Sequence, residues 1–279
     1  MTKGLKSLTT TLSKMEDTFR YILTLAATKK AHPESSWVRI TTVTMIAKFE
    51  HDINLPLFRE KFKTVKIRSK GSSFDGFEWN LKKTTFYNQV TIFTRDQYSN
   101  KSIKLFPNGS VQVAGCSDLL DCRRIARLVD LIVNQTIGSD TPNRLNLDTI
   151  SVKMINTNFS LNSSVNLSKV IQAFSQPQGV FLVTFDPDRY SAVKVKFCPA
   201  PGMKRVTASI FSTGKIIVTG AQTLKEIALA YKIINEVLSP ASVRLGVSDK
   251  KDVFETILGH KFSEWVPKLQ TKGITPWIS

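Results

Sequence analysis

Residues 206–221 read VTASIFSTGKIIVTGA, and residues 103–115 read IKLFPNGSVQVAG. A constant offset of 105 positions separates the landmark residues of the two stretches, which are Phe106 and Phe211, Gly109 and Gly214, and Gly115 and Gly220. Each stretch consists of two short strand-like runs on either side of a glycine turn. Because the offset is constant, the sequence predicts two copies of one structural unit.

An amphipathic helix is expected after each pair of strands. After Gly115, apolar residues recur at the spacing of one helical face, at Ile125, Leu128, Val129, Ile132 and Val133. After Gly220 the same spacing gives Leu224, Ile227, Ala228, Tyr231, Ile234 and Leu238. Thr223 and Glu226 are spaced as a capping box at the start of the second helix, and Pro240 lies just past its end.

Both copies extend upstream in the same order. The first copy has a strand, a short helix and a strand-like run at residues 37–46, 53–58 and 86–93. The second has a strand, a short helix and two strand-like runs at residues 150–155, 165–170, 180–185 and 190–197. This order predicts an α+β protein, in which the helices cover one face of an antiparallel sheet and leave the other face open.

The repeats divide the chain into four expected parts. These are an N-terminal helical extension at 1–36 with a helix from Leu12 to Thr28, a first repeat at 37–140, a second repeat at 141–239, and a basic C-terminal extension at 240–279. Within the last part we expect a short helix near residues 252–258 and exposed side chains at Trp265 and Trp277.

The charge of the chain points to a polyanionic partner. Lys and Arg number 39 and Asp and Glu 22, so the net charge is +17, and 42% hydrophobic residues exclude a wholly disordered chain. Nucleic acid and an acidic membrane surface are the usual partners of such an excess, and nucleic acid is favoured. The apolar run from Tyr21 to Ala27 is too short for a membrane span.

The sequence contains no pattern typical of catalysis or metal binding. His32, His51 and His260 are not in metalloprotease spacing, and phosphate-binding glycine motifs are missing. The three cysteines form no CxxC pair, which fits a reducing, intracellular compartment and indicates neither zinc nor a disulfide framework. The residues by themselves therefore indicate neither a catalytic site nor a metal site.

Basic residues stand beside aromatic residues on the expected strands of both repeats. The pairs are Lys82 and Lys83 before Phe86, Lys104 before Phe106, Arg189 before Tyr190, and Lys204, Arg205 and Lys215 around Phe211. A single Phe in a strand is more often part of the core. The recurrence of such pairs in both repeats favours a nucleic-acid-binding surface. The basic run at 61–70 is either a further phosphate contact or a solvated face.

At these residues the sequence resembles the TATA-box-binding protein family. That family's repeat carries a strand, Phe-x-x-Gly-Lys, a strand ending in Thr-Gly and a long helix, and residues 210–221 match it closely. Residues 105–115 match less closely and, together with residues 86–92, are similar to the divergent forms found in large DNA viruses. The resemblance covers residues 37–238.

The resemblance implies a set of DNA contacts in the minor groove. Two aromatic side chains per repeat would insert between base steps, namely Phe106 with Phe86 or Tyr87, and Phe211 with Tyr190. The family's base-reading asparagines align with Thr42 and Met154, which puts preference for a TATA element in doubt. The remaining implied contacts are Val113, Val218 and Thr219 on the strands after the glycine turns and Lys82, Lys83, Lys104, Lys204, Arg205 and Lys215 around the aromatic residues.

The resemblance also implies a fold and a function, with no enzyme activity and no cofactor. The fold would be a saddle of two quasi-symmetric repeats, with a concave antiparallel sheet on DNA and helices on the convex face. The function would be transcription initiation by a monomer that bends duplex DNA and recruits a B-type initiation factor or RNA polymerase, in a nucleus or a viral factory. Three alternatives remain open: a non-promoter nucleic-acid-binding protein in repair or packaging, an enzyme on the same scaffold, and an interaction protein anchored by Trp265 and Trp277.

Overall fold

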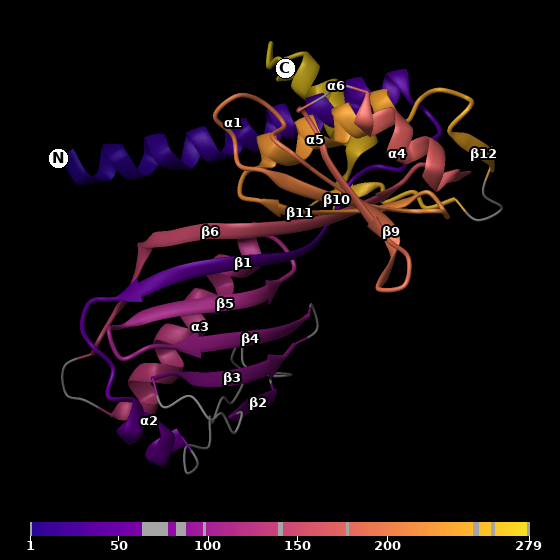
Figure 1. Ribbon diagram of the computed structural model, residues 1–279. Helices are drawn as coiled ribbons and strands as arrows, with labels where there is room; N and C mark the ends of the chain where they lie inside the picture. The colour runs from indigo at the N-terminus through magenta and orange to yellow at the C-terminus, as the bar shows by residue number, and fades with distance from the viewer. Residues whose placement is uncertain are drawn as a thin grey trace. The chain divides into compact units, whose positions relative to one another are not determined.

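The computed structural model describes residues 2–62, 78–81, 88–96, 99–138, 142–176, 179–247, 251–257 and 260–277. The chain forms two compact units, each shown in Figure 1. The first unit is Thr41–Ile155, and the second unit combines Met1–Ile40 with Asn156–Ser279. Both terminal extensions therefore belong to the second unit. The long strand β6 (Leu145–Ser160) begins in the first unit and ends in the second.

The first unit is an antiparallel sheet with helices on one face (Figure 1). Its strands follow the order β2-β3-β4-β5-β1-β6. The elements are β1 (Arg39–Phe49), α2 (Leu55–Phe62), β2 (Glu78–Leu81), β3 (Val90–Arg95), β4 (Asn100–Leu105), β5 (Ser110–Cys116) and α3 (Leu119–Ile137). The expected paired strands around Gly109 are confirmed as β4 and β5.

The second unit repeats this arrangement and adds the terminal extensions. Its sheet follows the order β6-β11-β10-β9-β8, and a small separate sheet pairs β7 with β12. The repeat elements are β7 (Ser163–Val165), α4 (Leu167–Ser175), β8 (Leu182–Asp186), β9 (Tyr190–Phe197), β10 (Val206–Phe211), β11 (Lys215–Ala221) and α5 (Leu224–Val237). The extensions add α1 (Thr2–Ala31), β12 (Arg244–Val247), β13 (Thr256–Ile257), β14 (His260–Lys261) and α6 (Phe262–Gln270).

Burial alternates along the strands, because successive side chains point to opposite faces of a sheet. In β11, Ile216 and Val218 are buried, whereas Ile217 and Thr219 are half-buried. The long helices contact these sheets, α3 at β5 and α5 at β11, and supply the apolar partners of the buried residues. We call the opposite, more exposed side of each sheet its open face. The expected arrangement of helices on one sheet face is confirmed in each unit.

The residues that cap the starts of α3 and α5, Asp118 and Thr223, are separated by the same 105 positions as the glycine turns. The Asp118 side chain accepts a hydrogen bond from Asp121 N at 2.8 Å. The Thr223 hydroxyl accepts one from Glu226 N at 3.2 Å, and the Glu226 carboxylate accepts one from Thr223 N at 3.1 Å. The predicted capping box is therefore confirmed, and both caps satisfy backbone N–H groups that a helix leaves unpaired.

The glycine turn between β10 and β11 is closely packed. Gly214 has a φ of 76°, and Leu161 N donates to its carbonyl at 3.0 Å. A Cβ atom at Gly214 would lie 1.9 Å from the carbonyl oxygen of Ser163. Gly202 has the same φ of 76°, but a Cβ atom added there would have no atom within 4 Å. The two positions therefore separate backbone strain from steric overlap.

We expect Gly214→Ala to lower the free energy of unfolding by about 1–3 kcal/mol more than Gly202→Ala does, because only the former forces atoms to overlap. Both variants carry the same left-handed backbone penalty. Urea unfolding of the two variants, followed by circular dichroism, measures the difference. Equal losses would show that the contact with Ser163 imposes no constraint.

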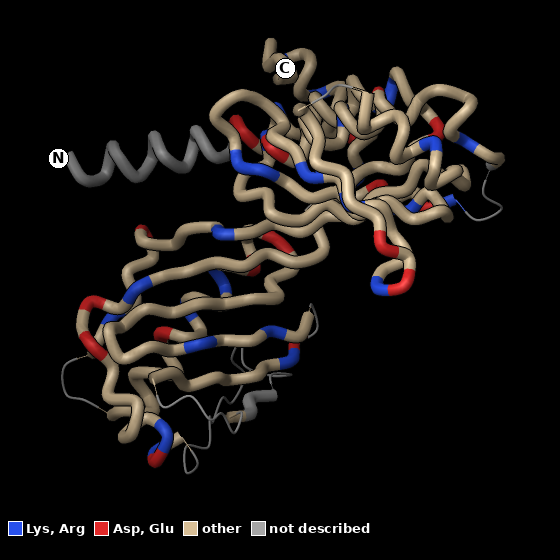
Figure 2. Tube along the Cα trace, viewed as in Figure 1, with Lys and Arg blue, Asp and Glu red and all other residues tan. Residues whose placement is uncertain are grey.

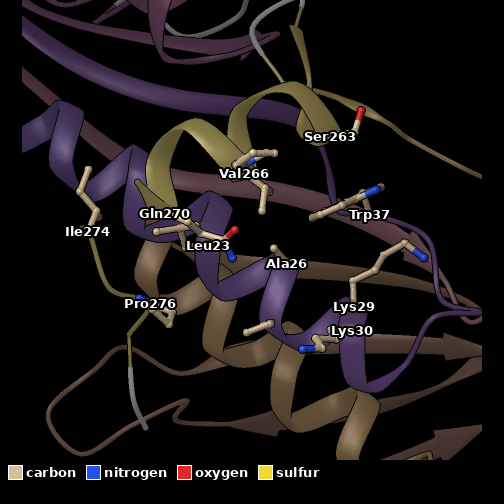
Figure 3. Close-up of a pocket in the computed structure, with 12 residues that line it drawn as sticks. Leu23, Ala26, Lys29, Lys30, Trp37, Ser263, Val266, Gln270, Ile274 and Pro276 are labelled. Atoms are coloured by element: carbon tan, nitrogen blue, oxygen red, sulfur yellow. The ribbon is translucent and has the colours of Figure 1, made fainter. Parts of the chain in front are cut away.

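The N-terminal extension is helical as predicted, but α1 begins at Thr2 rather than at Leu12. It lies beside α6, and the two helices and the chain after α6 line an apolar hollow of about 510 Å³. Figure 3 shows Leu23 and Ala26 of α1 across this hollow from Val266 of α6. None of the helices in the described part of the chain combines the length and the apolar character that crossing a bilayer requires.

Two expectations for the C-terminal extension are wrong. The helix expected near 252–258 is instead irregular chain followed by β13, and the helix of this region is α6. Trp265 and Trp277 are half-buried rather than exposed, because α1 supplies a packing surface. The Trp265 ring lies 5.8 Å from that of Phe19, and Trp277 N donates to Thr24 Oγ1 at 2.9 Å.

Candidate nucleic-acid interface

The open face of the second unit carries basic, hydroxyl and apolar side chains in cross-strand rows. In one row, Lys194 of β9 pairs with Ser209 of β10, which pairs with Ile217 of β11. In the next row, Lys196 pairs with Thr207, which pairs with Thr219. Lys194 and Lys196 are exposed, and basic positions occur on strands of both units (Figure 2). This face therefore offers cations beside small polar groups.

An aromatic pair lies next to these rows, where β9 begins and β10 ends. The rings of Tyr190, which begins β9, and Phe211, which ends β10, are 5.7 Å apart at an interplanar angle of 67°. Tyr190 is 37% exposed, and Phe211 is half-buried. Lys194 Nζ lies 4.6 Å from the centre of the Tyr190 ring, which is cation–π distance. The strands thus bring together the two aromatic residues that the sequence paired.

The open face of the first unit has a different composition. Lys104 of β4 pairs with Gln112 of β5, and in the next row Ser102 pairs with Ala114. Phe93 of β3, which pairs with Ser102, is 42% exposed. The position equivalent to the second unit's exposed lysine Lys196 is therefore aromatic here.

Of the aromatic pair expected in the first repeat, only Phe106 lies within the described residues. Phe106 is half-buried in the turn after β4 and lines a shallow hollow with Asn88, Pro107, Asn108 and Ser110. Its expected partners Phe86 and Tyr87 and the basic residues Lys82 and Lys83 lie outside the described residues. Most of the basic run at 61–70 also lies outside them, although Lys61 Nζ donates to the Ile137 carbonyl at 2.6 Å.

Two of the expected DNA contacts are wrong. Val113 is 0% and Val218 2% exposed, because both point to the helix-covered face of their sheets. Strand alternation puts their neighbours on the open face instead. These neighbours are Gln112 and Ala114 in the first unit and Ile217 and Thr219 in the second. Thr219 is therefore the expected contact on β11 that does face the open side.

The other expected contacts lie at or near the surface. Thr42 of β1 and Met154 of β6 are half-buried in the first unit, and Lys104 is half-buried as well. Lys204, Arg205 and Lys215 of the second unit are exposed, and Lys215 Nζ lies 3.7 Å from an Asp252 carboxylate oxygen. Sequence reasoning missed Lys194 and Lys196, although the alternating string KVKF at 194–197 could have indicated them.

Two of the three cysteines are buried and unreactive, whereas Cys198, just after β9, is exposed. Cys116 and Cys122 are buried, and a hydrogen bond to Cys122 together with burial raises the pKa of the Cys116 thiol. A thiol with a raised pKa stays protonated and is a poor nucleophile at neutral pH. Across the described residues, no three His, Cys, Asp or Glu side chains gather closely enough to hold a metal ion.

Comparison with known proteins gives three consistent similarities. The family model described as "Transcription factor TFIID (or TATA-binding protein, TBP)" matches residues 131–241. The "TATA-box-binding protein-like" protein of Acanthamoeba polyphaga mimivirus is 27% identical over 241 residues, covering 72% of this chain and 65% of the relative. The match thus spans less than two thirds of that relative's length.

The third similarity concerns the fold. The structure of Methanococcus jannaschii TBP superposes with a TM-score of 0.50 at 16% sequence identity, covering 72% of this chain and 98% of the archaeal one. At that identity the match concerns the fold alone, and it confirms the expected α+β class with its open antiparallel sheet. The family model matches the second repeat, where the sequence motif is closest to the family's.

Proposed function

We propose that this chain, which is similar to TBP-like proteins in sequence and fold, binds duplex DNA through the open faces of its sheets, from the minor groove, and acts in transcription initiation. The geometry of Tyr190 and Phe211 carries this proposal. Two adjacent rings at the end of a sheet face can enter a base step from the minor groove. In the TATA-binding-protein family such insertion costs a few kcal/mol of unstacking, which the larger contact with bent DNA offsets.

Exposed cations on the second unit would hold the phosphate backbone. Lys194 and Lys196 lie on the open face, and Lys204, Arg205 and Lys215 lie beside β10 and β11. Each phosphate that a protein neutralises releases counterions, so the logarithm of the binding constant falls by about 0.9 per contact for each unit of log salt. Binding by this route is therefore steeply salt-dependent.

Sequence preference would come mainly from DNA shape. Thr42 and Met154 stand where the family carries base-reading asparagines. The minor groove distinguishes little more than A·T from G·C pairs, and A·T-rich segments differ in groove width and stiffness. We expect a moderate preference for A·T-rich sites. This departure is also the observation that favours the second candidate function, a nucleic-acid-binding protein of repair or packaging.

The remaining parts of the proposal follow from the resemblance. A B-type initiation factor or RNA polymerase would be the protein partner, and a monomer with two repeats would suffice for one DNA site. Such a protein would act in a nucleus or, as a viral protein, in a viral factory. Formation of a ternary complex with an initiation factor separates the promoter role from the second candidate.

Fluorescence anisotropy with A·T-rich and G·C-rich duplexes tests the proposal over a salt series from about 50 to 200 mM. We expect tight binding that weakens steeply with salt, tighter binding to the A·T-rich duplex, and weaker binding by Phe106→Ala/Phe211→Ala. Energy transfer between the duplex ends measures bending. Salt-dependent binding with no A·T preference and no bending would support the second candidate, and no duplex binding would contradict both.

A further inference from the structure

The C-terminal extension is fastened beside the glycine turn that joins β10 to β11. Asn162, a buried residue between β6 and β7, holds it through its side-chain amide. The amide oxygen accepts a hydrogen bond from Asp252 N at 2.9 Å, and Nδ2 donates to the carbonyls of Asp252 and Glu34 at 3.0 and 2.9 Å. The neighbouring Leu161 N donates to the Gly214 carbonyl at 3.0 Å. The backbone of Asp252 is therefore tied to the corner that packs against this turn.

The side chain of Asp252 reaches the lysine that begins β11. One of its carboxylate oxygens lies 3.7 Å from Lys215 Nζ. Strand alternation places Lys215 on the open face with Ile217 and Thr219. Lys215 also follows Phe211 across the glycine turn, so it stands next to one ring of the aromatic pair. A carboxylate of the extension therefore occupies the position at which the proposed DNA complex would place a phosphate.

The contact between Lys215 and Asp252 is one that another anion can displace. The lysine side chain is 66% exposed and the aspartate side chain 33%. The distance of 3.7 Å is longer than a hydrogen bond, and an ion pair in contact with solvent contributes little to stability. A phosphate oxygen can form a shorter, charge-assisted hydrogen bond with the same ammonium group. The lysine can therefore exchange the carboxylate for a phosphate.

The equivalent turn of the first unit is built differently. Ser110 begins β5 at the position where a lysine begins β11. Phe49 N donates to the Gly109 carbonyl at 2.9 Å, which repeats the backbone contact of the second unit. The next residue, Glu50, donates its N–H to the Arg144 carbonyl at 2.9 Å, so the chain leading into β6 holds this corner. A phosphate would therefore meet a serine at the first turn and a lysine with its tethered carboxylate at the second.

We propose that Asp252 competes with DNA phosphate for Lys215, so that the C-terminal extension limits how tightly the second unit holds the DNA backbone. This inference rests on the proposed function, because it requires a duplex on the open face. The carboxylate acts in two ways: it occupies the ammonium group in the free protein and repels a phosphate that approaches it. Its removal frees one cation for the DNA backbone.

Asp252→Asn tests this competition directly. The substitution keeps the size of the side chain, and the hydrogen bonds to Asn162 use only the backbone of residue 252. We expect the full-length variant to bind a fluorescein-labelled A·T-rich duplex about threefold or more tighter than the native protein at about 50 mM salt. The slope of log affinity against log salt should steepen by up to about 0.9, because one more phosphate is neutralised. Anisotropy titrations measure both quantities.

The same substitution in a Lys215→Ala background shows whether Asp252 acts through that lysine. There we expect Asp252→Asn to change duplex affinity by less than about 1.5-fold, because no cation is freed. The matched control is Glu264→Gln, which removes one negative charge from an exposed position on α6 of the same extension. It should also change affinity by less than about 1.5-fold, because salt screens a charge that lies away from the phosphate contact.

The outcomes separate this inference from the proposed function. An equal gain in Glu264→Gln, or in the Lys215→Ala background, would overturn the competition, because the gain would then follow from net charge. Duplex binding by the native protein with no change of affinity or slope in Asp252→Asn would overturn this inference alone. Absence of duplex binding by the native protein and by Asp252→Asn would contradict the proposed function together with it.

Discussion

Replacing Tyr190 and Phe211 together with alanine is expected to lower the affinity for an A·T-rich duplex by about 100-fold. Stacking of a base on an aromatic side chain is worth about 1–3 kcal/mol, and about 1.4 kcal/mol corresponds to a factor of ten in affinity. Both rings lie together at the exposed end of β9 and β10, so the double variant removes both stacking contributions. Anisotropy titration at one salt concentration measures the change.

The dependence on salt distinguishes this effect from weaker binding of the phosphate backbone. Alanine at the two aromatic positions removes no cation, so the slope of log affinity against log salt should stay unchanged. Lys204→Ala/Arg205→Ala, by contrast, should lower that slope by about 0.9 for each phosphate that the protein no longer neutralises. The control Tyr190→Phe/Phe211→Tyr keeps both rings and should retain affinity within about threefold. A changed slope in the alanine variant, or an equal loss in the ring-preserving control, would contradict base insertion.

The repeat and its elements could be predicted because local residues determine them. Gly109 and Gly214 have the φ values that favour glycine, and Thr223 with Glu226 caps α5 through neighbouring backbone groups. Such signals act over a few residues and are readable in one sequence. The α6 helix was missed because it contains Pro267 and depends on distant contacts, including a Trp37 ring that stacks 4.3 Å from Phe262.

Which face of the sheet each candidate contact occupies was harder to predict than the strand on which it lies. Residues 216–218 read IIV, so all three are apolar and the alternation that marks the two faces is hidden. The resemblance implied that Val218 faces the DNA, but Val218 is buried under α5, whereas Ile217 is half-buried on the open face. The pairing of Tyr190 with Phe211 could be predicted because both belong to a repeated motif. The repeat itself does not indicate Lys196, since the equivalent position of the first repeat is Phe93.

A buried cluster of charges links β4 to α3 in the first unit. The Lys101 side chain is fully buried, and its Nζ lies 2.9 Å from Asp96 and 3.1 Å from Asp121. Arg124 contacts both carboxylates from the partly exposed side. Burial lowers the pKa of the Arg124 guanidinium, but its hydrogen bonds to Asp96 and Asp121 outweigh burial and raise it. The two carboxylates therefore depend on two cations, one of them inaccessible to water.

Lys101→Met is expected to lower the free energy of unfolding by about 3–5 kcal/mol, because it leaves two buried carboxylates with a single cation. That loss is a large part of the stability of a typical domain, about 5–15 kcal/mol. The matched control Lys104→Met lies on the same strand but faces the open side, and should cost less than about 1 kcal/mol. Urea unfolding followed by circular dichroism measures both variants. Equal stability of Lys101→Met and Lys104→Met would show that Arg124 alone compensates Asp96 and Asp121, and that the buried lysine contributes little to the first unit.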